Sequence, residues 1–385
     1  MKKNKLKVLH VIGRMDRGGA EVMLMDFLRN IPSNVHFDFL INSRPSERNI
    51  KGSFDDEILS LGGSLNYIGT QWHIGIFNYI KDFKKIISKT GKPDVVHIHL
   101  NAKCGVIALA AKLCGIEKII SHSHAALSYK GRILKSFPHY MELQFQKLLI
   151  AMFATDYWGC SIEANSSLYY KWMLTSKRAY VFKNAIDINS YKNISANSVA
   201  TLRNSFRLKS NEIVIGNVGR IVKHKKLDLI IEILNVLNKH GFPFKFVYAG
   251  KCDDKKFHQQ LIKKISDYEL NSKVIYLGEV SEIPELMSSF DMFLAPSLNE
   301  GFGMVAIEAQ AGSVPCILSY GFPKMVDMDL GLVSFIKGEN PTYWANKIMA
   351  YEKTIPEVTD VFKRIEDKGF DINTNIKSLL YKYKN

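Results

Sequence analysis

Two pairs of charged residues in the C-terminal half have the types and the spacing that suit a sugar nucleotide. Arg220 and Lys225 follow the apolar run Ile213–Val218, so both cations should emerge where a strand ends. A guanidinium and an ammonium group held this close can share the two charges of a diphosphate. Glu300 and Glu308 follow eight residues apart, and carboxylates accept hydrogen bonds from vicinal sugar hydroxyls.

A glycine loop and the start of a helix lie between the two glutamates. Their backbone amides, together with the helix N-terminus, can bind sugar oxygens and phosphate. The residues concerned are Gly301, Phe302, Gly303, Met304 and Val305. The charge of a carboxylate beside a diphosphate must be neutralised, and the arginine and lysine supply that balance. The alternative is that Glu300 caps a helix and Glu308 lies on a solvated face.

A second glycine loop lies near the N-terminus, where Gly18 and Gly19 join the first expected strand to a helix over residues 20–29. Glycines allow the backbone to approach a bound phosphate or sugar. The spacing differs from GxGxxG, and no acidic residue follows a second strand at the expected distance, so NAD binding is disfavoured. A simple tight turn is the alternative interpretation.

Two histidine pairs stand where parallel strands should end: His97 with His99, and His122 with His124. Alternation along a strand sends both members of a pair to the same face of the sheet. Such a pair could bind a metal, but no Cys, Asp or Glu accompanies it at ligand spacing. We therefore expect no metal site, and a structural role for His97 remains the alternative.

The whole chain alternates short apolar segments with amphipathic stretches, which predicts parallel sheets with crossover helices. In the N-terminal half the expected strands are Val8–Ile12, Phe37–Ile41, Val95–His99, Lys118–Ser121, Tyr157–Cys160 and Tyr180–Phe182. In the C-terminal half they are Ile213–Val218, Phe244–Ala249, Val274–Leu277, Met292–Ala295 and Val314–Leu318. The fold class is therefore α/β.

The length of 385 residues fits two α/β domains. We place the first Rossmann-like domain at residues 1–185, a linker at 186–198 and the second Rossmann-like domain at 199–370. Residues 371–385 have helical spacing and should pack back onto the first domain. No apolar run is long enough to span a bilayer, and the five cysteines are far apart without a CxxC pair, so we expect a cytoplasmic protein.

The motifs together resemble glycosyltransferase family 4 of the GT-B fold. They are GGAE in the first loop, HxH, KNAID at residues 183–187, GRxxxxK and E-x7-E. The likeness covers nearly the whole chain and is greatest to bacterial exopolysaccharide, capsule and O-antigen transferases. It implies two facing Rossmann-like domains with parallel sheets and a deep interdomain cleft.

The resemblance implies a role for each matching residue of the second domain, which would bind the donor. Arg220 and Lys225 would bind the donor diphosphate and stabilise it as it departs. Glu300, with the backbone of Phe302 and Gly303, would hold the donor sugar.

By the same resemblance, Glu308 would hold the ribose of the donor. In the first domain, which would bind the acceptor, Gly18 and Gly19 would approach the phosphate and the reacting centre. His124 would lie beside the anomeric carbon.

The expected reaction is transfer of a hexose or N-acetylhexosamine from a nucleotide-sugar, most readily a UDP-sugar, to a lipid-linked saccharide, with retention of the anomeric configuration. No metal or other cofactor is expected. A non-catalytic sugar-nucleotide-binding subunit and an epimerase of the same fold are the alternatives. A phosphorylase of this fold is disfavoured because it would need a lysine that binds pyridoxal, in surroundings specific to that role.

Three departures from the family pattern bear on these roles. Lys226 stands where the family often has Gly or Asn, so it could share the role of Lys225. Ser313 follows Gly312 directly after the donor helix, which alters the expected turn. Ala185 replaces the glycine of the commoner linker motif.

The basic charge is unevenly distributed. Residues 1–190 contain 26 basic and 15 acidic residues, a net +11, whereas the rest of the chain has a net +4. No motif that reads RNA or DNA accompanies this charge, so nucleic acid is not an expected partner. Residues 132–151 alternate basic and apolar side chains as an interfacial helix would. We therefore expect peripheral attachment to the anionic inner face of the plasma membrane.

Overall fold

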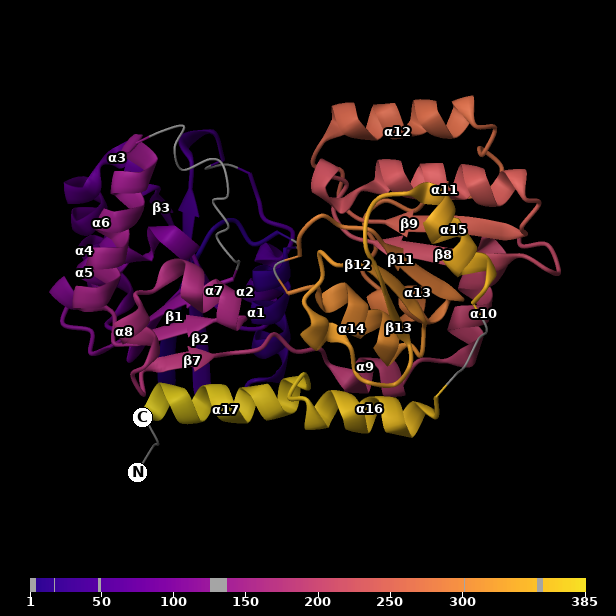
Figure 1. Ribbon diagram of the computed structural model, residues 1–385. Helices are drawn as coiled ribbons and strands as arrows, with labels where there is room; N and C mark the ends of the chain where they lie inside the picture. The colour runs from indigo at the N-terminus through magenta and orange to yellow at the C-terminus, as the bar shows by residue number, and fades with distance from the viewer. Residues whose placement is uncertain (1–4, 17, 48–49, 125–136, 301, 352–355) are drawn as a thin grey trace. The chain divides into compact units, whose positions relative to one another are not determined.

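The computed structural model describes residues 5–16, 18–47, 50–124, 137–300, 302–351 and 356–385. The chain divides into two compact units (Figure 1). The first comprises residues 1–185 and 372–385, and the second comprises residues 186–371. Residues 186–198, where we expected a linker, lie in the second unit and form α9 (Ile188–Lys192) and the start of α10 (Ala196–Ser205).

The first unit contains a parallel sheet of seven strands in the order β3-β2-β1-β4-β5-β6-β7. The strands are β1 (Leu6–Ile12), β2 (Val35–Ser43), β3 (Ser64–Gly69), β4 (Val95–Ile98), β5 (Lys118–Ser123), β6 (Asp156–Gly159) and β7 (Ala179–Val181). The helices are α1 (Gly19–Asn30), α2 (Asp55–Ser60), α3 (Gln71–Ile74), α4 (Ile76–Thr90), α5 (Cys104–Leu113), α6 (Phe137–Phe153), α7 (Ile162–Leu168), α8 (Lys171–Leu174) and α17 (Ile372–Lys384).

The second unit contains a parallel sheet of six strands in the order β10-β9-β8-β11-β12-β13. The strands are β8 (Ile213–Val218), β9 (Phe244–Ala249), β10 (Val274–Tyr276), β11 (Met292–Ala295), β12 (Cys316–Ser319) and β13 (Val333–Ile336). Besides α9 and α10, the helices are α11 (Leu227–Lys239), α12 (Lys255–Asp267), α13 (Ile283–Ser288), α14 (Met304–Ala311), α15 (Pro341–Met349) and α16 (Val358–Asp367). Both sheets have the 3-2-1-4-5-6 order of a doubly wound Rossmann fold.

The α/β fold class is confirmed, and each expected strand is present. Two further strands, β3 and β13, were not predicted. Both lie at sheet edges, and most of their side chains are partly exposed, so neither has a continuous apolar run. An edge strand has a neighbour on one side only, which relaxes the apolar pattern on which sequence prediction depends.

Helices cover both faces of the first sheet (Figure 1). On one face α4, α5 and α6 enclose a core that includes Tyr79, Phe83 and Ile150. On the other face α1 and α17 enclose a second core. The C-terminal helix α17 contributes Leu379 and Tyr383 to that core, so the end of the chain completes the first unit.

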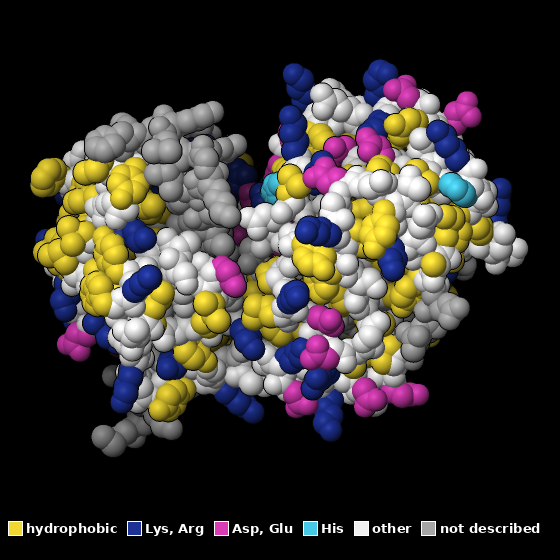
Figure 2. All heavy atoms as spheres, in the orientation of Figure 1, with side chains coloured by type: hydrophobic (Ala, Val, Ile, Leu, Met, Phe, Trp, Pro, Cys, Tyr) yellow, Lys and Arg dark blue, Asp and Glu magenta, His cyan; other side chains and the backbone are white. Residues whose placement is uncertain are grey.

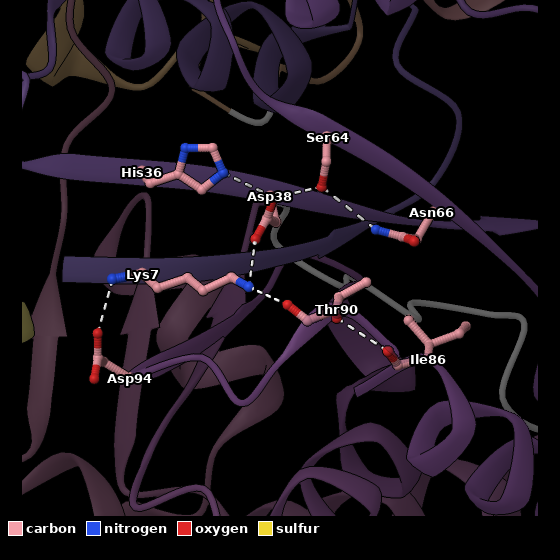
Figure 3. A network of polar contacts seen from close by, with 8 residues as sticks. All are labelled: Lys7, His36, Asp38, Ser64, Asn66, Ile86, Thr90 and Asp94. Carbon is pink, nitrogen blue, oxygen red and sulfur yellow. Dashed lines mark hydrogen bonds and ion pairs between the residues drawn. The ribbon is translucent and has the colours of Figure 1, made fainter. Parts of the chain in front are cut away.

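A polar network ties together the first three strands (Figure 3). The Lys7 ammonium pairs with the Asp38 carboxylate at 3.4 Å, and the Lys7 backbone N–H donates to Asp94 at 2.8 Å. Asp38 is 4% exposed and also accepts from Ser64, the first residue of β3. Because a buried carboxylate needs donors on all sides, this network stabilises the register of an edge strand that has little apolar pattern.

Candidate functional site

The topology of the second sheet brings two distant loops together. Strands β8 and β11 are neighbours and lie where the strand order reverses. The loop after β8 carries Arg220 and Lys225, and the loop after β11 carries Glu300. In doubly wound sheets, ligands bind at the carboxyl ends of the strands at this switch point.

Lys225 and Glu300 meet directly at the switch point. The Lys225 Nζ atom lies 2.7 Å from Glu300 Oε1 and 2.8 Å from Glu300 Oε2. The two side chains are only 15% and 10% exposed, so the ion pair is largely enclosed. Two of the three N–H donors of the lysine therefore point at this carboxylate, and one remains for another acceptor.

Backbone contacts between loops fix Glu300 in this place. The Leu298 N–H donates to the His224 carbonyl at 2.8 Å, and the Glu300 N–H donates to the Gly321 carbonyl at 2.9 Å. A side chain at Gly321 would place its Cβ 2.1 Å from the Ser297 carbonyl oxygen, so only glycine permits this close approach. The loops after β8, β11 and β12 thus form one connected support.

The helix expected behind Glu300 is α14, and its N-terminus depends on Gly303. This residue has φ +82°, and a Cβ there would lie 2.5 Å from the Phe322 ring. Phe302 is buried, so its side chain supports the start of α14. Met304 and Val305 form the first turn, where backbone N–H groups point out of the helix.

Two further candidate residues of this region remain. Gly301 lies outside the described residues. Glu308 lies on α14 and is half-buried. The altered turn that follows this helix has Ser313 in the left-handed region at φ +57°, two residues before Pro315, where the family resemblance led us to expect glycine.

The other cations of the loop after β8 have different partners. Arg220 pairs with Asp253, after β9, at 3.3 Å, and its side chain is 50% exposed. Lys226 pairs with Glu339 at 2.8 Å, and this hydrogen bond raises the lysine pKa. Lys225 is therefore the lysine that contacts Glu300, and Lys226 is directed to another acid. The sequence interpretation missed Asp253, for which residues 253–254 at a strand end were the only signal.

The candidate residues of the first unit also lie at a switch point, between β1 and β4. Gly18 is the N-cap of α1 and Gly19 its first residue. A Cβ at Gly19 would meet no described atom within 4 Å, whereas one at Gly18 would meet the Glu21 side chain at 2.3 Å. The turn at Gly19 therefore leaves room over the start of α1.

Five histidines from three neighbouring strands, joined by hydrogen bonds in one group of three rings and one group of two, form a layer of contacting rings that we call the histidine layer. Its members are His10, His97, His99, His122 and His124. Rings within each HxH pair lie 4.1 and 4.0 Å apart, so each pair does share a face. His10 was missed by the sequence interpretation because a single histidine in an apolar strand gives no signal. Tyr383 of α17 closes the layer by contacting His97 Nδ1 at 2.7 Å.

Three rings of the layer form a chain from the core to the candidate catalytic residue. His10 Nδ1 lies 3.0 Å from His99 Nε2, and His99 Nδ1 lies 2.8 Å from His124 Nε2. Three neutral rings supply three N–H groups and three lone pairs, and two hydrogen bonds use two of each. One N–H and one lone pair are left at the ends, His10 Nε2 and His124 Nδ1, both buried without a partner among the described residues. A proton added to the remaining lone pair would therefore create a buried N–H with no hydrogen-bond acceptor among the described residues.

The layer is accordingly held neutral. Burial lowers the pKa of both His10 and His124 to about 3. Burial, together with neighbouring histidines, lowers the pKa of His97, His99 and His122 well below the usual value.

Two groups of three ring nitrogens in the layer are close enough to hold a metal, each within 4.8 Å. In the part of the chain that the structure describes, both groups consist of histidine alone. A divalent ion would bring two uncompensated charges into this core. We interpret the layer as hydrogen-bonded neutral imidazoles.

Comparison with known proteins identifies the family. The family model for "Glycosyl transferases group 1" matches residues 198–364. The Bacillus subtilis glycosyltransferase relative EpsF is 31% identical over an alignment that covers 100% of this chain and 97% of EpsF. The chain belongs to the group 1 glycosyltransferases.

Two further comparisons agree with this family. An Escherichia coli UDP-Gal:alpha-D-GlcNAc-diphosphoundecaprenol alpha-1,3-galactosyltransferase is 29% identical over 62% of each chain. The crystal structure of Anabaena HepE with UDP-glucose matches with a TM-score of 0.76 at 18% identity, over 98% of this chain and 99% of HepE. With its two parallel Rossmann-like sheets, this glycosyltransferase has the GT-B fold, as the sequence predicted.

We expect acid to destabilise the first unit through the histidine layer. An unfolded histidine has a pKa near 6.5, whereas the layer's histidines have lowered pKa values in the folded chain. Below about pH 6.5 the unfolded chain therefore binds more protons, and the free energy of unfolding falls as the pH falls. Each histidine contributes up to about 1.4 kcal/mol per pH unit.

The substitution His10→Phe keeps a flat ring against Phe37 and Phe39 but removes one titrating group. Urea unfolding at a series of pH values should show a slope reduced by about one proton relative to the parent. The control His73→Gln changes an exposed histidine of α3 and should leave the slope unchanged. An unchanged slope in His10→Phe would contradict the assignment of a neutral buried layer.

Proposed function

We propose that this glycosyltransferase moves a hexose or N-acetylhexosamine from a UDP-sugar to a hydroxyl of a lipid-linked saccharide, with retention at the anomeric carbon, in the assembly of a cell-surface polysaccharide. The second unit binds the donor and the first unit binds the acceptor. The observation that carries the proposal is the enclosed pair of Lys225 and Glu300 at the switch point of the second sheet.

The pair suits a donor because it combines the two kinds of group that a sugar diphosphate needs. The ammonium group of Lys225 faces the phosphate, and the carboxylate of Glu300 accepts from sugar hydroxyls. Arg220 adds a second, more exposed cation for the diphosphate. The N-terminus of α14 contributes its backbone amides and partial positive charge beside Glu300. Glu308, farther along α14, is assigned to the ribose.

The names of similar proteins support the choice of substrates. HepE was crystallised with UDP and with UDP-glucose. The E. coli relative is named for transfer of galactose from UDP-Gal to a sugar on diphosphoundecaprenol. A UDP-sugar donor and an acceptor attached to a lipid diphosphate are the corresponding substrates that we propose for this chain.

The transfer step needs no protein nucleophile. The bond between the anomeric carbon and the phosphate oxygen breaks, and the acceptor oxygen bonds to that carbon on the same face. The acceptor proton passes to the departing phosphate oxygen. Arg220 and Lys225 stabilise the charge that develops on the diphosphate. We assign His124, together with the backbone at Gly18 and Gly19, to the reacting centre.

The first prediction concerns affinity for UDP, measured by isothermal titration calorimetry. Arg220→Ala and Lys225→Ala should each weaken UDP binding by about tenfold or more, because each removes a charge-assisted hydrogen bond to the diphosphate. Lys225→Ala should have the larger effect, since it also leaves the Glu300 carboxylate unpaired to repel phosphate. Lys226→Ala is the matched control, because that lysine pairs with Glu339. Equal UDP affinity in all three variants would refute the diphosphate site.

The second prediction concerns the rate of sugar transfer. Glu300→Ala and Glu308→Ala should each lower the transfer rate on the order of 100-fold or more, since each removes an acceptor for donor hydroxyls that tightens in the transition state. The assay is transfer from a panel of UDP-, GDP- and ADP-sugars to a lipid-diphosphate saccharide. Glu339→Ala is a control acid on the same unit with a 52% exposed side chain. Near-parental rates in both glutamate variants would contradict the assignment of Glu300 and Glu308 to the donor site.

The third prediction concerns divalent metal. Transfer should proceed at the same rate in excess EDTA as with added Mg²⁺, because the arginine and lysine neutralise the departing diphosphate in place of a metal. The measurement compares initial rates under the two conditions with the same enzyme preparation. A loss of activity in EDTA that Mg²⁺ restores would show that the diphosphate needs a metal partner.

A further inference from the structure

Helix α6 displays a row of large apolar side chains to solvent. Met141, Phe145, Leu148 and Met152 are between 44% and 62% exposed. Their spacing of four, three and four residues places them on one face of the helix. We call these four residues the α6 stripe. Single exposed apolar residues are ordinary, whereas a continuous row marks a surface that is covered in use.

The opposite face of α6 fixes the stripe outward. Leu149 and Ile150 are buried in the core of the first unit. Gln146 accepts a hydrogen bond from the Val106 N–H at 3.1 Å, and a Cβ on Gly105 would lie 2.5 Å from the Gln146 carbonyl oxygen. Because α5 and α6 approach this closely, α6 cannot rotate to bury its stripe within the unit.

Neighbouring helices extend the apolar surface. Leu113 at the end of α5 is 51% exposed. Trp172 on α8 is 61% exposed and stacks beside Tyr170, whose ring lies under Lys147 of α6. Figure 2 shows hydrophobic side chains gathered over the region of α4, α5 and α6, with basic side chains among them. An exposed tryptophan next to lysines is typical of a membrane interface.

The same helices carry an excess of positive charge. Helices α4, α5 and α6 contain six lysines and two acidic residues, a net +4. The lysines are Lys81, Lys84, Lys85, Lys89, Lys112 and Lys147. Lys81, Lys85 and Lys89 follow one another at helical spacing on α4, are exposed, and form no ion pair with another described residue. This surface therefore has unneutralised cations beside an apolar stripe.

We propose that the layer of α4, α5 and α6 docks on an anionic phospholipid bilayer, with the α6 stripe entering the headgroup region and the lysines contacting lipid phosphates. A second copy of the chain fits the surface less well, because two-fold pairing would bring the same positive face together. No helix among the described residues is long and apolar enough to cross a membrane. The purpose of docking, access to a lipid-linked acceptor, rests on the proposed function, whereas the surface itself does not.

Docking should appear as co-sedimentation of the whole protein with vesicles of mixed phosphatidylglycerol and phosphatidylcholine. We expect at least about tenfold weaker binding to pure phosphatidylcholine, and release from anionic vesicles as the salt concentration rises. Changing both Phe145 and Leu148 to Ser should lower binding by about tenfold or more. Changing Lys81, Lys85 and Lys89 to Gln should lower binding by about fivefold for each charge removed. The emission of Trp172 should shift to the blue with vesicles, and Trp172→Phe should abolish the shift.

Matched controls separate docking from misfolding and from the transferase assignment. Leu59→Ser with Leu61→Ser changes exposed apolar residues at α2, away from α6, and should leave vesicle binding unchanged. All surface variants should keep the parental UDP affinity, because the candidate donor site lies in the second unit. Lys130, Arg132 and Lys135, three basic residues that precede α6 in the sequence, lie outside the described residues.

Three outcomes would overturn the proposal. The first is equal binding of the parent to neutral and anionic vesicles, or no binding to either. The second is undiminished binding after Phe145 and Leu148 are changed. The third is a dimer in solution that these two changes dissociate, which would make a second copy the occupant of the stripe. Surface variants that lose vesicle binding but still transfer sugar to a short-chain soluble acceptor would support docking. They would also leave the transferase assignment in place.

Discussion

The parallel pairing of β8 with β11 is the constraint on which the candidate donor site depends. It joins strands that are separated in the sequence by β9 and β10, so the loops that follow them meet although Lys225 and Glu300 are 75 residues apart. A right-handed, doubly wound topology creates only one such place in each sheet. The enclosed ion pair can form there because backbone hydrogen bonds hold the loops in register and Gly321 permits their close approach. A change in strand order would separate the pair, however well the local motifs were kept.

The first sheet uses the same topology with a different chemistry. Its switch point is lined by rings rather than by ions, and His10, His99 and His124 lie in a chain that holds no net charge. Such a layer positions His124 through His99, since the ring can turn only by giving up a buried hydrogen bond. It also makes the C-terminal helix part of the unit's core, because Tyr383 is hydrogen-bonded to His97, which lies 286 residues earlier in the sequence. We expect this arrangement to make the unit sensitive to acid.

The sequence predicted those features that depend on local pattern. The central strands have apolar runs, and E-x7-E and GRxxxxK marked Glu300 and Lys225 as candidate residues, which the structure brings into contact. Features that depend on pairing between distant segments were missed. Edge strand β3 is stabilised by Lys7 and Asp38 rather than by an apolar pattern of its own.

Contacts between distant segments also determine which partner each charged residue has. The choice between Lys225 and Lys226 could not be made from spacing, because it depends on whether Glu300 or Glu339 lies within reach. The partnership of Asp253 with Arg220 was missed for the same reason. In the second unit three of the four cations of the loop after β8 have carboxylate partners, among them Arg220 and Lys225, so the two residues proposed for the diphosphate are already paired before a donor arrives. A diphosphate must therefore replace a carboxylate rather than fill an empty cationic site. The pair of Arg220 and Asp253 is half-exposed and weakly bound, whereas the pair of Lys225 and Glu300 is enclosed and costly to separate. In the proposed site the exchange would therefore fall first on Arg220, which can turn toward an incoming phosphate while Lys225 keeps its carboxylate and offers its remaining N–H.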